Sequence, residues 1–253
     1  MDTSWSKVAN WYDSHLENDN DSYQAKLILP NLKRILGAIQ GKKVIDIGCG
    51  QGFFSRELAK LGATVHGIDL AEDLIKIAKH KNTDKNSKIT YEVLSADSLN
   101  GIKDNEYDIA ISVLAIQNME HFTKVFNETS RVVKNGGKFI FILNHPVFRI
   151  PKFTSWEFSK VHQSRKIDKY LSQIKSEINM EPAKGSNGKK TYSFHRSLQD
   201  YMKALFSNGF NVSKFEEWIS HKQSQAGPRK ALEDTARKEF PLFLMIEATK
   251  NTQ

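Results

Sequence analysis

The sequence is short of cysteine and of long apolar runs. Its 253 residues include one cysteine, Cys49, which excludes an internal disulfide and a metal site built from several thiolates. No run reaches the ~18 consecutive apolar residues of a membrane-spanning helix. The first twenty residues contain acids and no apolar stretch, so we expect no secretory signal either. These absences favour a cytoplasmic protein.

The sequence is rich in apolar residues and carries a net positive charge. Hydrophobic residues make up 39% of the sequence, enough to bury a sizeable core, and the formal net charge is +8. Between His145 and Arg196, eleven lysines and arginines stand against four acids, which places +7 in one segment. Concentrated charge attracts an anionic substrate, an acidic surface or nucleic acid. A solvated basic face is an alternative of equal weight.

Segments of strand character alternate with segments of helical periodicity. The expected strands are 44–47, 64–69, 89–94, 107–114, 138–143, 211–218 and 241–249. The expected helices are 22–39, 53–61, 72–80, 122–133 and 198–208. Most of the strands are continuous apolar runs, which is typical of a parallel sheet covered by helices on both faces. The pattern predicts an α/β fold with a doubly wound sheet.

The alternation stops between residues 146 and 192. This segment holds three prolines and several aromatic residues, and we expect no strand in it before 191–194. Apolar residues at helical spacing predict a helix over 166–178. We interpret the segment as an insertion carried on the sheet. Its aromatic residues, Trp156 among them, either wall a substrate pocket or form a small core of their own.

The loop between the first expected strand and helix is rich in glycine. The stretch VIDIGCGQG, residues 44–52, places Asp46 in the strand and then three glycines at alternate positions. Such a loop lets the backbone turn sharply and approach a ligand closely. The spacing differs from the G-x-G-x-x-G of dinucleotide-binding proteins, which disfavours an NAD-dependent dehydrogenase. Asp69, at the end of the second strand, is placed to accept hydrogen bonds from ribose hydroxyls.

Several motifs together resemble a known family. The stretches VIDIGCGQG, GIDLAEDLI, SAD (95–97), YDIAISVLAIQNMEH and RVVKNGGKFIFIL, in this order, are similar to class I S-adenosylmethionine-dependent methyltransferases. The resemblance is closest to the small-molecule enzymes that include the ubiquinone and menaquinone methyltransferases. It implies a Rossmann-like sheet of seven strands in the order 3-2-1-4-5-7-6 with the last strand antiparallel. It also implies one domain over 1–253, with an N-terminal helical segment (1–40) and a substrate-side lid (146–192).

The resemblance implies S-adenosylmethionine as the cofactor and a set of residues around it. Asp46 and the glycine backbone would hold the methionine moiety, Asp69 the ribose and Asp97 the adenine amine. The full set is Tyr12, Asp46, Gly48, Cys49, Gly50, Gly52, Asp69, Leu70, Ala96, Asp97, Ser98, Val113 and Leu114.

Methyl transfer to a hydroxyl, an amine or an acidic carbon requires a base, and histidine suits that task near neutral pH. We expect His145 or His195 to be catalytic, with His121 as a further candidate near the substrate. Arg149 and Arg196 are candidates to bind a substrate carboxylate or phosphate. Each of these residues has a structural role as its alternative.

The sequence thus predicts methylation of a small molecule, anionic or aromatic, by a protein whose oligomeric state is not readable. An RNA methyltransferase is the second hypothesis, supported by the basic segment but by no recognisable RNA-binding module. A third is a regulatory protein that binds the cofactor without turning it over.

Overall fold

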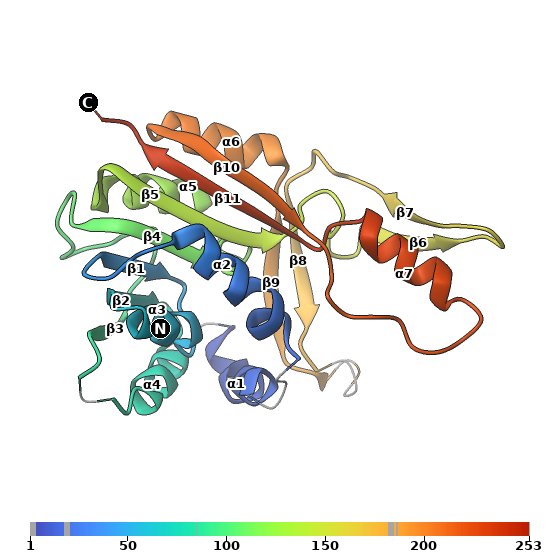
Figure 1. Cartoon of the computed structure of the whole chain (residues 1–253), viewed down its shortest axis with the longest axis horizontal. Coiled ribbons are helices and arrows are strands. Elements are labelled where there is room, and N and C mark those ends of the chain that lie inside the picture. The colour runs from blue at the N-terminus through green and yellow to red at the C-terminus, as the bar shows by residue number, and fades with distance from the viewer. Residues whose placement is uncertain (1–3, 18–20, 85, 182–184, 186, 253) are drawn as a thin grey trace.

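The computed structural model describes residues 4–17, 21–84, 86–181, 185 and 187–252. Its centre is a seven-stranded sheet in the order β10-β11-β5-β4-β1-β2-β3 (Figure 1). The strands are β1 (Lys43–Ile47), β2 (Thr64–Asp69), β3 (Ile89–Val93), β4 (Tyr107–Val113), β5 (Val133–Asn144), β10 (Phe210–Trp218) and β11 (Phe243–Lys250). β11 is antiparallel to both of its neighbours, and the pairs from β5 to β3 are parallel. The predicted fold class and strand order are confirmed.

Helices cover both faces of this sheet. The α-helices are α1 (Ala9–Glu17), α2 (Leu29–Leu36), α3 (Phe53–Lys60), α4 (Glu72–Lys81), α5 (Phe122–Val132), α6 (Leu198–Ser207) and α7 (Lys230–Glu239), of which α2 and α3 cover one face and α5 and α6 the other. On one face, Phe126 of α5 and Tyr201 of α6 pack against Phe139 and Phe141 of β5. Ile140 points to the opposite face, into the cluster built by α2 and α3, because side chains alternate along a strand. Within the described residues, no helix is long and apolar enough to cross a membrane.

The segment after β5 forms two antiparallel hairpins. Their strands are β6 (Thr154–Phe158), β7 (Gln163–Ile167), β8 (Ile174–Asn179) and β9 (Lys190–His195). The prediction of a helix over 166–178, with no strand before 191–194, is therefore wrong. Lys169 has a left-handed backbone, with a φ of 55°, which interrupts a right-handed helix at the middle of that range. Leu171, expected on the apolar helix face, is 74% exposed.

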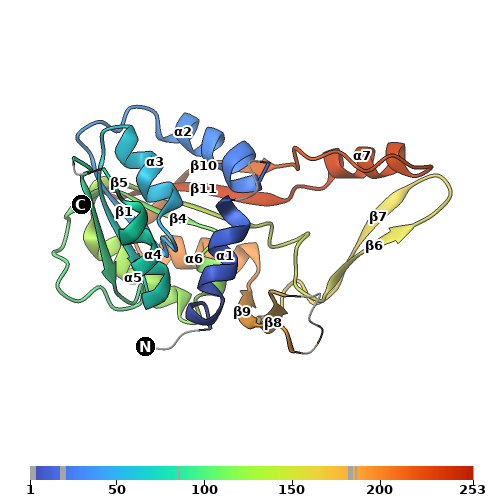
Figure 2. The same cartoon turned by 90° about the horizontal axis from the view of Figure 1, so that it is seen from below.

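The first hairpin and α7 project together from the body of the molecule. Figure 2 shows β6 and β7 extending away from the sheet with α7 alongside them. Helix α7 is not among the helices predicted from the sequence. The second hairpin stays close to the carboxyl ends of the central strands, below the end of β5 in Figure 1. The two hairpins consequently serve different parts of the surface.

Candidate active site

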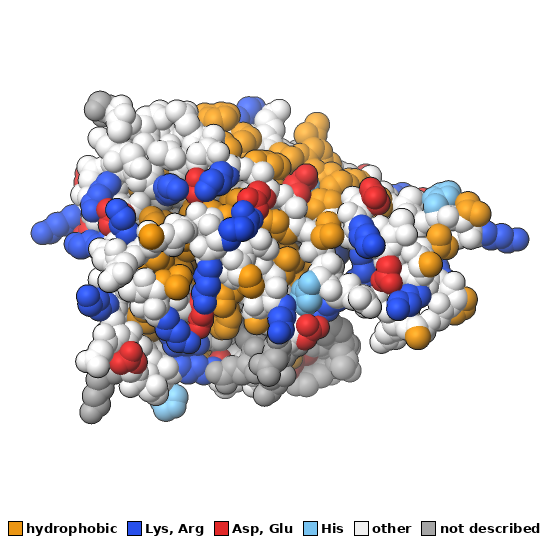
Figure 3. All heavy atoms as spheres, in the orientation of Figure 1, with side chains coloured by type: hydrophobic (Ala, Val, Ile, Leu, Met, Phe, Trp, Pro, Cys, Tyr) orange, Lys and Arg blue, Asp and Glu red, His pale blue; other side chains and the backbone are white. Residues whose placement is uncertain are grey.

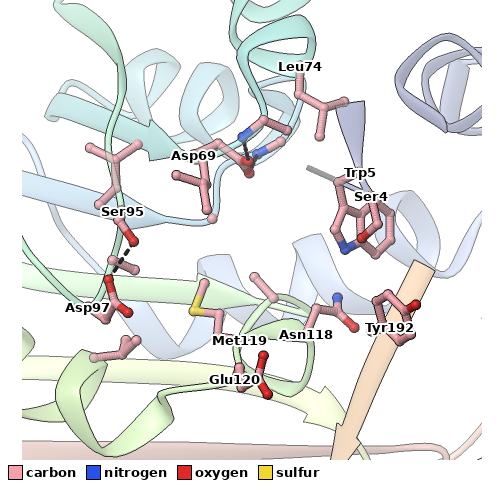
Figure 4. Close-up of a pocket in the computed structure, with 18 of the residues that line it drawn as sticks. Ser4, Trp5, Asp69, Leu74, Ser95, Asp97, Asn118, Met119, Glu120 and Tyr192 are labelled. Carbon is pink, nitrogen blue, oxygen red and sulfur yellow. Dashed lines mark hydrogen bonds between the residues drawn. The ribbon is translucent and has the colours of Figure 1, made fainter. Parts of the chain in front are cut away.

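A cavity with a volume of about 400 Å³ opens at the carboxyl ends of β1, β2 and β4. Its lining comes from the glycine loop, the ends of β2 and β3, residues 113–121, α1 with the residues before it, and the second hairpin (Figure 4). Doubly wound sheets bind ligands at this edge because the strand order reverses there, leaving a crevice between the outgoing loops. We refer to it as the main cavity.

The glycine loop forms one wall of the main cavity, and Gly48 cannot be replaced without displacing its surroundings. Its φ is +75°, and a Cβ on Gly48 would lie 2.5 Å from Cβ of Ala115 and 3.0 Å from Cε of Met119. The amides of Gly48 and Cys49 both donate to the carbonyl oxygen of Ile68, at 2.8 and 2.9 Å. The loop is thereby fixed to β2 in a conformation that leaves room for a ligand against bare backbone.

Asp69 ends β2 and faces the main cavity. Its Oδ2 accepts from the amide of Gly50 at 2.9 Å, and its Oδ1 accepts from the amide of Ala71 at 2.8 Å. Burial raises the pKa of Asp69, while these amide donors act in the opposite direction. Each oxygen has a second lone pair, so the carboxylate can accept two further hydrogen bonds from a ligand diol. The side chain is held in place before any ligand arrives.

A polar pair and apolar side chains build the neighbouring wall. Ser95 Oγ donates to Asp97 Oδ1 at 2.5 Å, as the dashed line in Figure 4 shows. Ala96 also lines the main cavity, as do Leu70 and Leu94. Flat apolar surface beside a carboxylate suits a ring system that carries an amino group, because the ring packs and the amine donates.

The open side of the main cavity is bordered by α1 and by the second hairpin. Tyr12 of α1 packs edge-on against Trp5, with 5.6 Å between ring centroids. Across the cavity, Lys175 Nζ lies 4.9 Å from the ring centroid of Tyr192 and 5.3 Å from that of Phe194. Figure 4 shows Trp5 and Tyr192 on the side of the cavity away from Asp69 and Asp97. This end combines aromatic surface with a cation.

Comparisons with known proteins agree with this geometry. Residues 45–141 match the family model described as "Methyltransferase domain". A solved structure of an S-adenosylmethionine-dependent methyltransferase from Mesorhizobium loti superimposes with a TM-score of 0.69 and 27% identity. That match covers 87% of this chain and 96% of the other. Residues 45–141 thus form a methyltransferase domain, and the chain has the fold of the class I S-adenosylmethionine-dependent methyltransferases.

Two similar relatives of this methyltransferase are ubiquinone biosynthesis O-methyltransferases. The one from Hydrogenovibrio crunogenus is 35% identical over 100 residues, which cover 40% of this chain and 42% of the relative. The one from Bordetella avium is 31% identical over 130 residues, covering 51% and 54%. The chain therefore spans about half the length of the curated relatives it matches. The resemblance to the ubiquinone group is confirmed at the level of the family.

S-adenosylmethionine is the cofactor of this family, and the main cavity fits it. The predicted cofactor residues that line the cavity are Tyr12, Gly48, Gly50, Asp69, Leu70, Ala96, Asp97, Val113 and Leu114. Among the described residues, a Cβ on Gly50 would meet only Cε1 of Tyr12 within 4 Å, at 3.8 Å, so the backbone there is open to a ligand. Asp69 carries the free lone pairs that a ribose requires. The cavity thus contains groups suited to each part of the cofactor except the methionine ammonium.

Four predicted cofactor residues lie behind the cavity wall. Asp46 is 2% exposed and accepts from Ser55 Oγ at 2.6 Å, and burial raises its pKa to about 7. Burial likewise raises the pKa of the Cys49 thiol, and a Cβ on Gly52 would meet the hydroxyl oxygen of Tyr91 at 2.4 Å. Ser98 is the fourth. The structure does not bring these side chains to the cavity, although their backbone supports it.

Of the three candidate histidines, His121 alone lines the main cavity. His145 is 1% exposed, with Nε2 2.7 Å from Glu217 Oε1 and Nδ1 accepting from the amide of Val147. Nε2 of His195 lies 2.8 Å from the carbonyl oxygen of Tyr170. Burial lowers the pKa of both imidazoles, against the opposing effect of these partners. The two histidines expected to be catalytic therefore sit in framework positions.

The other predicted substrate residues are divided between two places. Arg149 and Trp156 line a second, separate cavity beside the projecting hairpin. Arg196 is 3% exposed and donates to the carbonyl oxygens of Met119 and Glu120, at 2.6 and 2.8 Å. Its guanidinium carbon also lies 4.2 Å from the ring centroid of Phe122. Arg196 thus supports the floor of the main cavity, and the structure does not place it among the lining residues.

Several residues that line the main cavity are not among those predicted from the sequence. They include Trp5, Asn118, Met119, Glu120, Lys175, Tyr192 and Phe194. The alternation of Tyr192 and Phe194 in TYSF is the available signal, since residues two apart share one strand face. The basic segment between His145 and Arg196 does not form one surface patch, because its lysines and arginines lie in different parts of the structure. Figure 3 shows lysines and arginines interspersed with acids over one face of the molecule.

Proposed function

We propose that the protein transfers the methyl group of S-adenosylmethionine to a hydroxyl group on a small aromatic molecule. The observation that supports this most is the shape of the main cavity. It runs without interruption from the glycine loop and Asp69 to the aromatic surface of the second hairpin. One continuous space therefore has room for a nucleoside-like cofactor and a small acceptor together. The relatives named O-methyltransferases support a hydroxyl as the acceptor group.

The chain's own residues would hold the cofactor in four contacts. The backbone at Gly48 and Gly50 lies against its amino acid portion, and Asp69 accepts from its ribose. Asp97 accepts from its adenine amine, with Leu70 against the ring. When bound, S-adenosylmethionine supplies a methyl group that is electrophilic because it is joined to a sulfonium. These contacts orient the reacting group, which accounts for much of the catalysis in such a transfer.

The second hairpin would bind the acceptor. Tyr192 and Phe194 offer flat apolar surface, and Lys175 supplies a positive charge that favours an acceptor with an anionic substituent. Lys175 is itself within 3.3 Å of both carboxylate oxygens of Glu120, so its position is fixed by a local partner. The acceptor is therefore expected to be a small aromatic compound with negative or electron-rich character.

His121 is the group placed to take the acceptor's proton. It lines the main cavity and directly precedes α5. Methyl transfer to the acceptor oxygen would release the hydroxyl proton, and the imidazole of His121 would accept it.

The test is transfer of label from methyl-tritiated S-adenosylmethionine into phenols and catechols, with RNA and protein fractions assayed alongside. Wild type, His121→Ala and His80→Ala are compared. His80 is an exposed histidine of α4 that does not line the main cavity. We expect label in a small phenolic product, with kcat reduced on the order of 100-fold in His121→Ala and unchanged in His80→Ala.

Cofactor binding by calorimetry separates the failures. An inactive His121→Ala that still binds S-adenosylhomocysteine with wild-type affinity supports the role of the base. Wild-type kcat in His121→Ala with a hydroxyl acceptor overturns that role. Label found in RNA and absent from small molecules overturns the proposed acceptor class.

A further inference from the structure

The second cavity lies between the projecting hairpin, α7 and the end of β5. Its volume is about 280 Å³. Figure 1 shows α7 and the first hairpin beside the end of the sheet, and Figure 2 shows them running together away from the body. No described residue lines both cavities. A ligand here would not occupy the space assigned to methyl transfer.

Three arginines from different elements converge on this cavity. Arg149 follows β5, Arg165 lies in β7 and Arg237 lies in α7. Burial and the nearby charge of Arg237 lower the pKa of Arg149, and burial and the charge of Arg149 lower that of Arg165. The three cations are therefore close enough to repel one another.

Within the described residues none of these three guanidinium groups forms a salt bridge, although the charge of Arg237 contributes to the lowered pKa of Asp234. Arg165 donates to the carbonyl oxygen of Phe148 and to Thr154 Oγ1, and Arg237 donates to Ser224 Oγ. Arg149 has no side-chain hydrogen bond within the part of the chain that the structure describes, and none of the three forms a salt bridge there. Like charges held together without a counter-charge are destabilising unless an anion joins them.

Aromatic rings form the walls around the arginines. The centroids of Trp156 and Phe240 are 5.3 Å apart, and those of Phe148 and Phe240 are 5.5 Å apart, both in edge-to-face arrangements. The guanidinium carbon of Arg165 lies 4.9 Å from the ring centroid of Trp156. An inorganic ion would make no use of the apolar surface of these rings. A planar apolar group attached to the anion would pack against them.

Two further polar residues belong to the lining. Glu233 is the one acid among the described lining residues, so the described lining carries an excess of positive charge. The side-chain oxygen of Gln163 has no hydrogen-bond partner in the described chain, but it is closed to solvent, so a ligand in the cavity does not reach it. The site thus calls for an anion joined to a ring.

We propose that the second cavity is a binding site for a small organic anion, a carboxylate or phosphate joined to an aromatic ring, distinct from the methyl-transfer site. The guanidinium groups of Arg149 and Arg237 bind the anionic oxygens from two sides, and Arg165 stacked on Trp156 borders the ring. Guanidinium groups suit this task because their paired N–H donors match carboxylate and phosphate oxygens. The site does not depend on the acceptor proposed for the main cavity.

The test is calorimetric titration of the full chain with phenyl phosphate, benzoate, inorganic phosphate and phenol, each with S-adenosylhomocysteine present to fill the main cavity. We expect phenyl phosphate or benzoate, or both, to bind at one site. Inorganic phosphate and phenol should bind at least about tenfold more weakly, because each lacks one half of the recognised chemistry. The better of phenyl phosphate and benzoate identifies the anionic group.

Matched variants then assign the site. Arg149→Ala and Arg237→Ala should each weaken binding at least about tenfold. Lys238→Ala is the control, since it removes the same charge from an exposed position of α7 outside the cavity. Arg149→Lys should lose part of the affinity for the anion. Lysine keeps the positive charge but lacks the paired N–H donors of a guanidinium group. Circular dichroism and S-adenosylhomocysteine affinity confirm that each variant is folded.

Three results would overturn the proposal. One is the absence of saturable binding by both phenyl phosphate and benzoate. Another is an equal loss of affinity in Lys238→Ala and in Arg149→Ala, which would indicate general attraction to a basic surface. The third is binding that appears only when S-adenosylhomocysteine is omitted from the titration, which would place the anion in the main cavity.

Discussion

Residues 43–143 and residues 146–195 border the same main cavity but are built in different ways. In the first region β4 is buried at every position except Asp108, which is partly exposed. In the second region β6 has no buried residue at all. The first region holds its ligand groups by backbone geometry and short hydrogen bonds. The second presents long side chains from exposed hairpins, so its residues can change with little effect on the core.

The largest expected effect comes from the glycine loop. Gly48 and Gly41 have nearly equal φ values, +75° and +74°, but a Cβ would clash at Gly48 and meet nothing within 4 Å at Gly41. Alanine at either position costs roughly 1 kcal/mol of folding free energy through the left-handed backbone. Gly48→Ala should in addition reduce methyl transfer on the order of 100-fold by displacing the loop.

The readouts are urea unfolding and cofactor affinity for both variants. Gly41→Ala should keep wild-type affinity for S-adenosylhomocysteine. Equal loss of affinity in the two variants would show that backbone strain, and not the crowding at Ala115, governs the loop.

Arg196→Met sharpens the comparison at the residue that directly follows the second region. Losing a buried guanidinium leaves the carbonyl oxygens of Met119 and Glu120 without donors, which should destabilise the fold by about 2–4 kcal/mol. Lys203→Met, an exposed lysine on α6, is the matched control and should change stability little. Urea unfolding measures both. A normal unfolding free energy with a raised KM for the acceptor would favour the substrate-binding role that the sequence suggests.

The sequence predicts the first region far better than the second. Gly48 and Asp69 are readable because a strand, a tight loop and a helix are consecutive, so short-range pattern fixes where their backbone and side chains lie. Arg149 and Arg196 have the same chemistry in the same basic segment, yet one lines a cavity and the other is buried beneath a loop. The directions in which these two side chains point depend on how the hairpins pack against the sheet. Local periodicity in the sequence does not predict that packing.

Asp46 gives a prediction of intermediate size. Burial raises its pKa to about 7 from an ordinary value of 3.8. Between these pH values the folded chain retains a proton that the unfolded chain releases. The contribution of Asp46 to the free energy of unfolding is therefore greatest below about pH 4 and falls as the pH rises towards 7. The slope from one such group is at most ~1.4 kcal/mol per pH unit.

Asp46→Asn should remove this contribution, leaving a shallower slope from Asp69, whose pKa burial also raises. Unfolding free energies of wild type and variant at about pH 4.5, 5.5 and 6.5 provide the measurement. Parallel curves for the two proteins would show that Asp46 is ionised in the fold.

Lys175→Met is expected to have the smallest effect on stability. Lys175 is exposed, and its contacts with Glu120 and the hairpin rings are of the surface kind, so the unfolding free energy should change by less than about 1 kcal/mol. Acceptor KM should rise while cofactor affinity stays unchanged. Steady-state kinetics with the best phenolic acceptor measure this, and an unchanged KM would remove Lys175 from the acceptor site.

The most direct test of the account is amide hydrogen exchange with and without S-adenosylhomocysteine, which occupies the cofactor site without reacting. We predict slower exchange at 48–50, 69–71 and 113–119, with no change in the projecting hairpin, 154–167. This result would place the cofactor in the main cavity on the first region. Slower exchange confined to 154–167, with none at the glycine loop, would contradict the assignment of the cofactor site.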